Sequence, residues 1–176
     1  TKMPEGYPKG FTFVEGTTPN TADYYGRGWC FKESSVANLV KDSDYCLDLG
    51  KLGDDTTVWY DIQKECMAGR AAPMTPEDFA AELELKSFTS KKADLPTVGA
   101  LYKAAYTKRF AVSTMLMYAQ LGWGDAEVIS LSRVLESGAL PKLESLQLAL
   151  NSIGDVGITA LATAVGSGAL AQLTTL

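Results

Sequence analysis

Histidine is absent from this sequence, and its absence removes several kinds of chemistry at once. Histidine is the commonest general acid–base residue, a frequent zinc ligand and the base of serine–histidine–aspartate triads. Catalysis of those kinds is therefore excluded. No other group of side chains makes a catalytic set, and we expect no cofactor and no metal.

Cysteine is scarce as well. Cys30, Cys46 and Cys66 make an odd number, and none of them belongs to a Cys-x-x-Cys motif. This favours free, buried thiols in an intracellular, reducing compartment, either the cytoplasm or an organelle. One disulfide with one remaining thiol is the alternative.

Long apolar runs and basic clusters are also missing. Residues 110–126 contain Ser113, Thr114 and Gln120, so they are too short and too interrupted to span a bilayer. The net charge is −5, and residues 111–176 hold two basic side chains against five acidic ones. Because nucleic acid requires clustered Lys and Arg, we expect no nucleic-acid ligand. We expect no membrane span either, although a partner in a membrane complex stays open.

What the sequence does contain is an internal repeat with an offset of 30 residues. Residues 124–125 and 154–155 are both Gly-Asp, and residues 137–140 and 167–170 are both Ser-Gly-Ala-Leu. The flanking apolar positions share the same offset, so chance does not explain the identities. The end of the chain therefore contains consecutive structural units.

The spacing within the second unit assigns a role to each position. Leu146 and Leu148 alternate inward on a short strand. The side-chain amide of Asn151 can bond backbone groups where the chain turns off that strand. The full pattern, Leu-x-x-Leu-x-Leu-x-x-Asn-x-Ile, consists of Leu143, Leu146, Leu148, Asn151 and Ile153.

A turn and a helix follow this strand. Gly154 and Asp155 make the turn, and Asp155 is expected to cap the helix. The helix should bury one face formed at spacings of three and four residues, and it should end at Gly166 and Gly168. That face consists of Ile158, Leu161, Ala162 and Val165.

Residues 115–176 resemble the ribonuclease-inhibitor type of leucine-rich repeat. The resemblance implies a curved solenoid of parallel strands with outer helices. On its concave strand face it places Gln147 and Ala149, flanked by Thr174, as contacts for a protein partner.

The array departs from the family pattern at both ends. In the first unit Leu121 stands where Asn is expected, which suits a first repeat that the N-terminal part of the chain covers. At the other end a third strand breaks off at Leu176. Two units are too few for a stable solenoid, so we expect the array to continue in a parent protein or to abut another subunit.

The N-terminal part shows no repeat. Residues 1–23 are predicted to form an extended arm with one strand-like stretch at residues 11–14, and this arm would be a second contact surface; the alternative is a loosely ordered tail. Gly26 and Gly28 allow a tight entry into a helix. The buried face of that helix is predicted to contain Trp29, Val36, Leu39 and Val40.

A short strand is predicted at residues 44–49, with Leu47 and Leu49 on one side, and a second at residues 56–62, where β-branched and aromatic residues gather. Two helices should follow and cap the first repeat. The first has Thr75 as N-cap, runs to about Lys86, and buries Phe79, Leu83 and Leu85. The second starts at Asp94 or Thr97 and buries Val98, Leu101, Tyr102 and Ala105.

Residues 27–33, Arg-Gly-Trp-Cys-x-x-Glu, resemble a block that algal and protist proteins carry ahead of leucine-rich repeats. More remotely, Trp29, Cys30 and Glu33 resemble a helix of Toll/interleukin-receptor domains. In enzymatic members of that family a glutamate on this helix acts on the ribose of NAD, so the resemblance implies that Glu33 is catalytic. The alternative is that Trp29 belongs to the core and Glu33 is a solvated or ion-paired helix residue.

Other local patterns predict no site. The aspartates of residues 42–55 lack the spacing of a calcium loop, and Gly26-Arg-Gly28 lacks the Lys-Ser/Thr of a phosphate loop. Trp123 is either a core residue or part of the surface that meets a partner.

These observations predict an α/β protein in which residues 24–110 form a small α+β portion. This portion caps a short leucine-rich repeat solenoid at residues 111–176, with parallel strands and outer helices. The predicted function is non-catalytic: a structural subunit or interaction module that binds one or more proteins through Gln147, Ala149 and Trp123. The alternative is an NAD-consuming enzyme, or its remnant, that uses Glu33.

Overall fold

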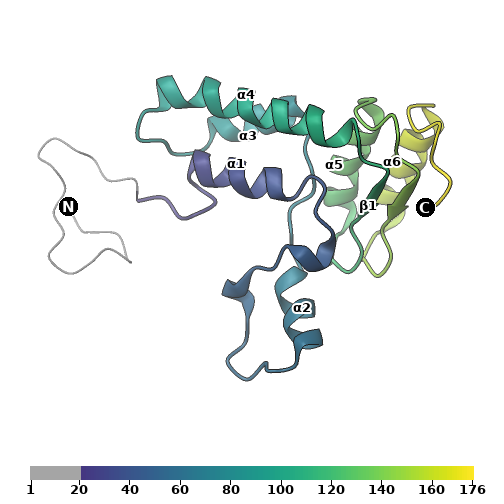
Figure 1. Cartoon of the computed structure of the whole chain (residues 1–176), viewed down its shortest axis with the longest axis horizontal. Coiled ribbons are helices and arrows are strands. Elements are labelled where there is room, and N and C mark those ends of the chain that lie inside the picture. Colours follow the sequence, from purple (N-terminus) through teal and green to yellow (C-terminus); the bar gives the residue numbers. More distant parts are fainter. Residues whose placement is uncertain (1–20) are drawn as a thin grey trace, which may run out of the picture.

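The computed structural model describes residues 21–176, and the predicted strand-like stretch at residues 11–14 lies outside this range (Figure 1). The described chain is helix-rich with two short parallel strands, so the predicted α/β class is confirmed at that coarse level. Its elements, in chain order, are α1 (Gly28–Ala37), η1 (Ser43–Tyr45), η2 (Leu49–Lys51), α2 (Trp59–Met67), α3 (Pro76–Glu84), α4 (Lys91–Phe110), β1 (Met115–Met117), α5 (Asp125–Glu136), β2 (Ser145–Gln147) and α6 (Asp155–Gly166).

The two strands lie side by side in parallel, and Leu116 pairs with Leu146 in their register. Beyond β2, Thr175 forms an isolated parallel bridge with Ser145. Helices α5 and α6 pack against each other beside the strands, as Figure 1 shows. Both β2 and α6 begin 30 residues after β1 and α5, which is the offset of the sequence repeat.

One core runs from the N-terminal helices into this strand–helix part. Aromatic rings stack along it, with centroids 5.0 Å apart for Phe31 and Phe79 and 3.7 Å apart for Phe79 and Tyr102. The hydroxyl of Tyr106 lies 2.9 Å from that of Ser137, which follows α5. Helix α4 is therefore packed onto the strand–helix part, and α1 and α3 pack against α4.

The two predicted helices after residue 70 are present with shifted bounds. Thr75 is the N-cap of α3, because its hydroxyl accepts a hydrogen bond of 3.1 Å from the Asp78 N–H. Helix α3 ends at Glu84, and Leu85 is exposed rather than buried. Helix α4 begins at Lys91, earlier than predicted. Its buried residues recur every four positions and are Val98, Tyr102, Tyr106 and Phe110. Leu101 does not belong to this series, so it points to solvent.

The two strands predicted before residue 70 are wrong. Residues 44–49 contain parts of two 3-10 helices, and residues 56–62 run into α2. A strand needs a neighbour to satisfy its backbone, and this region offers none. Its polar groups bond locally instead: the Asp48 N–H donates to the Cys66 carbonyl, and the Glu65 carboxylate accepts from the Gly53 N–H and the Thr56 hydroxyl.

Helix α1 starts close to another segment of the chain. The Gly28 N–H donates to the Ser87 carbonyl at 3.0 Å, and a Cβ atom at Gly28 would lie 1.8 Å from Cζ of Phe88. Glycine is therefore required here for close approach. Trp29 is 40% exposed, so its predicted place in the core is wrong, because its neighbour Gly28 takes the buried position.

Replacing Gly28 with alanine is expected to lower the free energy of unfolding by about 2 kcal/mol, since the Phe88 ring must move. Gly99→Ala is the matched control, because Gly99 lies inside α4 with no atom within 4 Å of an added Cβ. There we expect a gain of about 0.5–1 kcal/mol from helix propensity. Urea denaturation measures both, and equal effects of the two variants would contradict the close packing of Gly28.

Candidate protein-binding groove

One face of the two strands points to solvent and carries both polar and apolar side chains. We call it the strand face. On the other side Leu116, Tyr118 and Leu146 are buried. Because side chains alternate along a strand, the residues between them point outward. The strand face comprises Met115, Met117, Ser145 and Gln147, together with the exposed Ala149 just after β2.

A hollow of about 320 Å³ adjoins this face, and we call it the strand-face groove. Met117, Ala119 and Gln120 come from β1 and the turn after it, while η1 and α2 supply the other side. Gln147 is the register partner of Met117, so the predicted contact residue lies beside the groove. The lining residues are Asp42, Ser43, Asp44, Tyr45, Tyr60, Gln63, Lys64, Met67, Met117, Ala119 and Gln120.

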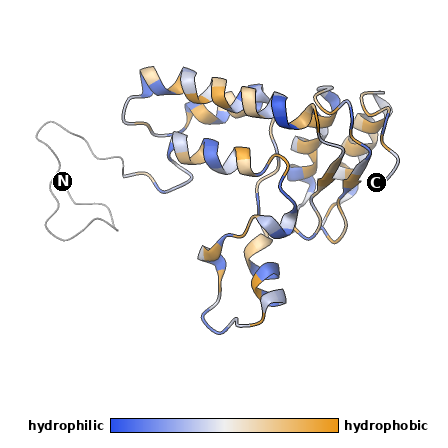
Figure 2. Cartoon of the chain, viewed as in Figure 1, coloured by the Kyte–Doolittle hydropathy of each residue, from blue (hydrophilic) through white to orange (hydrophobic). Residues whose placement is uncertain are grey.

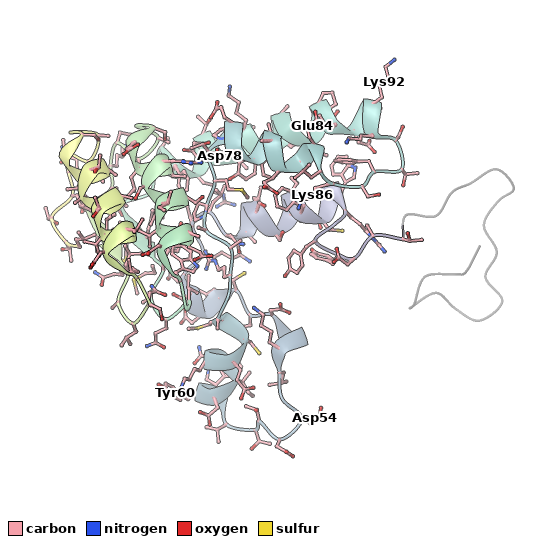
Figure 3. All side chains as sticks on the ribbon, turned by 180° about the vertical axis from the view of Figure 1, so that it is seen from behind. Asp54, Tyr60, Asp78, Glu84, Lys86 and Lys92 are labelled. Atoms are coloured by element: carbon pink, nitrogen blue, oxygen red, sulfur yellow. The ribbon has the colours of Figure 1, made fainter. Side chains whose placement is uncertain are left out.

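The wall of the groove carries exposed aromatic side chains. Tyr45 and Tyr60 line it, with 71% and 64% of their surfaces exposed. Trp59, which precedes Tyr60 and begins α2, is 62% exposed. Figure 1 shows α2 set apart from the other helices, and in Figure 3 Tyr60 projects from it toward the side on which α5 and α6 lie. Sequence reasoning missed these residues because it placed them in strands.

The side chains of Ser43 and Arg70 hold the wall against the strands. The Ser43 hydroxyl donates to the Met117 carbonyl at 3.2 Å. The Arg70 guanidinium donates to the carbonyls of Asn38 and Asp42, at 2.9 and 3.2 Å, and lies 5.5 Å from the centre of the Tyr118 ring. Residues far apart in the sequence thereby fix the width of the groove.

Asn151 bonds the backbone where both strands turn, as its position predicts. Its Oδ1 atom accepts hydrogen bonds of 3.0 Å from the N–H groups of Leu121 and Trp123. Its Nδ2 atom donates to the carbonyls of Tyr118 and Leu148, at 2.7 and 2.9 Å. One side chain therefore fixes the turns that follow β1 and β2.

The predicted role of Asp155 as a helix cap is wrong. Gly154 is the N-cap of α6, and Asp155 is the first helical residue with no side-chain capping bond. Asp125 does this work from the preceding helix, because its Oδ1 accepts from the N–H groups of Gly154 and Gly157, at 2.7 and 3.0 Å. The Gly-Asp sequence that both units share marks this contact between units. The aspartate of the first unit caps the helix of the next unit and not its own helix.

The face of α6 that was predicted to be buried is mostly exposed. Leu161 is buried, whereas Ile158 is 51% exposed and Val165 and Ala162 are also exposed. The corresponding residues of α5, Val128 and Leu135 among them, are buried because α6 packs against α5. Nothing in residues 21–176 covers α6 in the same way, although Figure 2 shows that this helix is largely apolar.

Trp123 belongs to the core and is not available to a partner. Only 1% of its surface is exposed, and its ring lies 4.8 Å from that of Tyr118. Its indole N–H donates to the Arg70 carbonyl at 2.6 Å. A buried indole needs such an acceptor, and this bond joins the segment before α3 to the turn after β1.

Glu33 is not placed with other functional groups. It is exposed on α1 and lines neither the strand-face groove nor the larger cavity beside α1.

Cys66 is buried, whereas Cys30 and Cys46 are half-buried, and all three thiols are free. The prediction of buried thiols thus holds for one cysteine of the three.

Two further findings concern the described part of the chain only. None of its helices has both the length and the apolar character needed to cross a bilayer. Within residues 21–176, no group of three or more Cys, Asp or Glu side chains is arranged to hold a metal ion. In particular, the Asp48 carboxylate accepts a hydrogen bond from the Gly50 N–H at the start of η2.

No family model matches the chain, and no characterised protein or solved structure matches it either.

Proposed function

We propose that this chain is a non-catalytic protein-binding module that uses the strand face and the strand-face groove. The observation that carries the proposal is the position of exposed aromatics beside the face that the repeat pattern assigns to partners. Tyr45 and Tyr60 line one side of the groove, and Met117 lines the other with Gln147 as its neighbour in β2. Tyr, Trp and Met are enriched where proteins bind one another, and anchors of this kind supply most of the affinity.

The proposal includes the leucine-rich repeat character of residues 111–176. Three observations support it: the shared 30-residue spacing of strands and helices, the parallel pairing of the strands, and the bonds of Asn151 to both turns. The contact of Asp125 with Gly154 and Gly157 adds a link between successive units. A partner that is itself a protein agrees with the net charge of −5, which disfavours nucleic acid.

The groove is tested by placing a photo-crosslinking amino acid at position 60 in the full chain and illuminating it in an extract of the source cells. We expect a defined protein to be crosslinked. The same group at position 92 is the control, because Lys92 lies on α4 far from the groove (Figure 3). Tyr60→Ala should weaken binding of the crosslinked protein by about 30-fold, since truncating an aromatic anchor costs about 2 kcal/mol. Equal crosslinking at both positions, or a free monomer with no partner, would contradict the proposal.

The repeat character is tested by adding a copy of residues 147–176 after Leu176, which continues the 30-residue register. The added unit should cover Ile158, Val165 and Leu176, and Asp155 should accept from its glycines as Asp125 does from Gly154 and Gly157. We expect the free energy of unfolding to rise by about 3 kcal/mol from this apolar burial. Ile158→Asn in the extended chain is the control and should cancel much of the gain. An extension that leaves stability unchanged would refute the repeat interpretation.

A further inference from the structure

A second hollow, larger than the groove, lies beside α1, and we call it the α1 cavity. Its volume is about 570 Å³, within the range of about 300–1,000 Å³ that is usual for small-molecule sites. It is bounded by α1, by residues 46–51, by the end of α2 and by the segment 68–71 that leads away from α2. The strand-face groove and the α1 cavity share one lining residue, Met67.

The α1 cavity is lined by a buried cation that lacks a charged partner. Arg70 is 7% exposed, and no carboxylate in residues 21–176 lies within ion-pair distance of it. Two of its N–H groups donate to carbonyls, while its Nε–H has no acceptor among the described residues. Burial lowers the pKa of Arg70, and Tyr118, Cys46 and Asp42 act in the opposite direction. Arginine nevertheless stays charged in proteins, so the cost of this buried charge is offset only in part.

Positive charge also predominates among the other charged residues of the cavity. Lys51 and Lys86 line it as well, against the single carboxylate of Asp48. The Lys51 ammonium donates to the Ala68 carbonyl and lies 3.9 Å from Asp48. The Lys86 ammonium lies 4.3 Å from the centre of the Phe31 ring and 3.8 Å from the Glu82 carboxylate, and Figure 3 shows this lysine beside α1. In a chain of net charge −5, this is a local excess of positive charge that attracts an anion.

The other walls are largely apolar. Phe31 comes from α1, Leu47 from the loop before η2, and Cys66 and Met67 from the end of α2. A multiply charged ligand such as a nucleotide would leave most of its charge against these side chains, at a large desolvation cost. An apolar molecule with one anionic group would satisfy both the walls and the buried guanidinium.

We propose that the α1 cavity is a binding site for a small apolar molecule that carries a single anionic group, such as a carboxylate. The apolar part lies against Phe31, Leu47 and Met67, and the anion is held by the positive charge of Arg70 with Lys51 and Lys86. Apart from Met67, the lining residues of this site are not those of the strand-face groove, so the proposal is tested independently of protein binding there.

The test compares octanoate with octanol as probes of the full chain, by titration calorimetry and by amide shifts in NMR spectra. The two probes have the same apolar part and differ in the charge. We expect octanoate to bind about 10-fold more tightly than octanol, because a hydrogen bond to a charged group contributes about 1.5–3 kcal/mol. The shifts should centre on Asn38 and Gly69, which line the cavity, and leave Gly157 unmoved.

Variants assign the binding to this cavity. Ser34→Phe places a ring in the hollow and should weaken both probes by about 10-fold or more. Lys51→Gln with Lys86→Gln should remove much of the preference for octanoate and leave octanol unchanged. Arg70 also donates to the carbonyls of Asn38 and Asp42, so the NMR spectrum of Arg70→Gln is used first to check that this variant is folded. In the folded variant the preference for octanoate should fall. Lys92→Gln is the control, since Lys92 lies outside the cavity.

The outcomes separate the possibilities. Octanoate binding that falls with Ser34→Phe but not with Lys92→Gln supports the proposal. Equal affinities for octanoate and octanol would overturn the anionic part. No binding of either probe at millimolar concentration, or binding that Ser34→Phe leaves intact, would overturn the site itself.

Discussion

Replacing Asn151 with alanine should lower the free energy of unfolding by about 3–4 kcal/mol. The side chain makes four hydrogen bonds to backbone groups, two as acceptor and two as donor. Alanine leaves those groups without a partner in a part-buried turn, and each unsatisfied group costs about 1–3 kcal/mol. Water reaches some of them, so the expected loss is smaller than the full sum. The turns after β1 and β2 should both loosen.

Chemical denaturation measures the loss, and hydrogen exchange locates it. The amides of Leu121 and Trp123 should exchange faster in Asn151→Ala, because they donate to Asn151. Asn151→Asp keeps that acceptor but places a negative charge near the carbonyls of Tyr118 and Leu148, so its loss should be intermediate. Gln147→Ala is the matched control, since the amide of Gln147 bonds only the Ser145 hydroxyl, at 3.2 Å. A loss for Asn151→Ala no larger than for Gln147→Ala would refute the role of Asn151.

Trp123→Ala should have a comparable or larger effect, with a loss of about 4 kcal/mol. Trp123 is among the largest completely buried side chains, and its indole N–H satisfies the Arg70 carbonyl. Its removal opens a cavity beside Tyr118 and also releases the segment that carries Arg70. The strand-face groove should lose its fixed width as a consequence.

Trp59→Ala is the control for this prediction, because Trp59 is 62% exposed and packs against little. We expect Trp59→Ala to change the free energy of unfolding by less than about 0.5 kcal/mol. Fluorescence gives a second measurement: Trp123→Ala should remove the emission of a tryptophan shielded from water, and Trp59→Ala that of an exposed one. Similar losses of stability in both variants would contradict the position of Trp123 in the core.

The elements that sequence reasoning located well are those with a complete local signal. Thr75 and Pro76 mark the start of α3 through groups within one helical turn. The spacing of Leu146 and Asn151 predicts β2 and the turn after it, because alternation and turn chemistry act over a few residues. Such signals do not depend on what else lies nearby in space.

The misses arise where a distant neighbour decides the outcome. Residues 56–62 have the composition of a strand, yet no other strand lies beside them, and residues 59–67 form a helix whose aromatics are exposed. Trp29 follows a glycine that packs on Phe88, which comes from after α3, and this turns the indole outward. Asp155 has the sequence of a cap, but the capping carboxylate of α6 belongs to Asp125, 30 residues earlier.

The candidate site divides in the same way. Gln147 and Ala149 could be assigned to the outer face from strand alternation. The opposite wall, with Tyr45 and Tyr60, could not, because long-range bonds of Ser43 to Met117 and of Arg70 to Asp42 help to hold it beside the strands. The bond of Ser43 to Met117 joins residues 74 positions apart, and no local pattern encodes such a pairing.

By itself, the sequence determined the 30-residue units, the direction in which their side chains alternate, and the asparagine that bonds their turns. These follow from the geometry of single strands and helices, which a few neighbouring residues dictate. Only the tertiary structure decided that α2 stands beside the strand face, that Trp123 is buried, that the far face of α6 is exposed, and that Arg70 lies without a carboxylate beside a cavity. Burial is a property of all the chain segments that meet at a point, so it is settled only when the whole chain has packed.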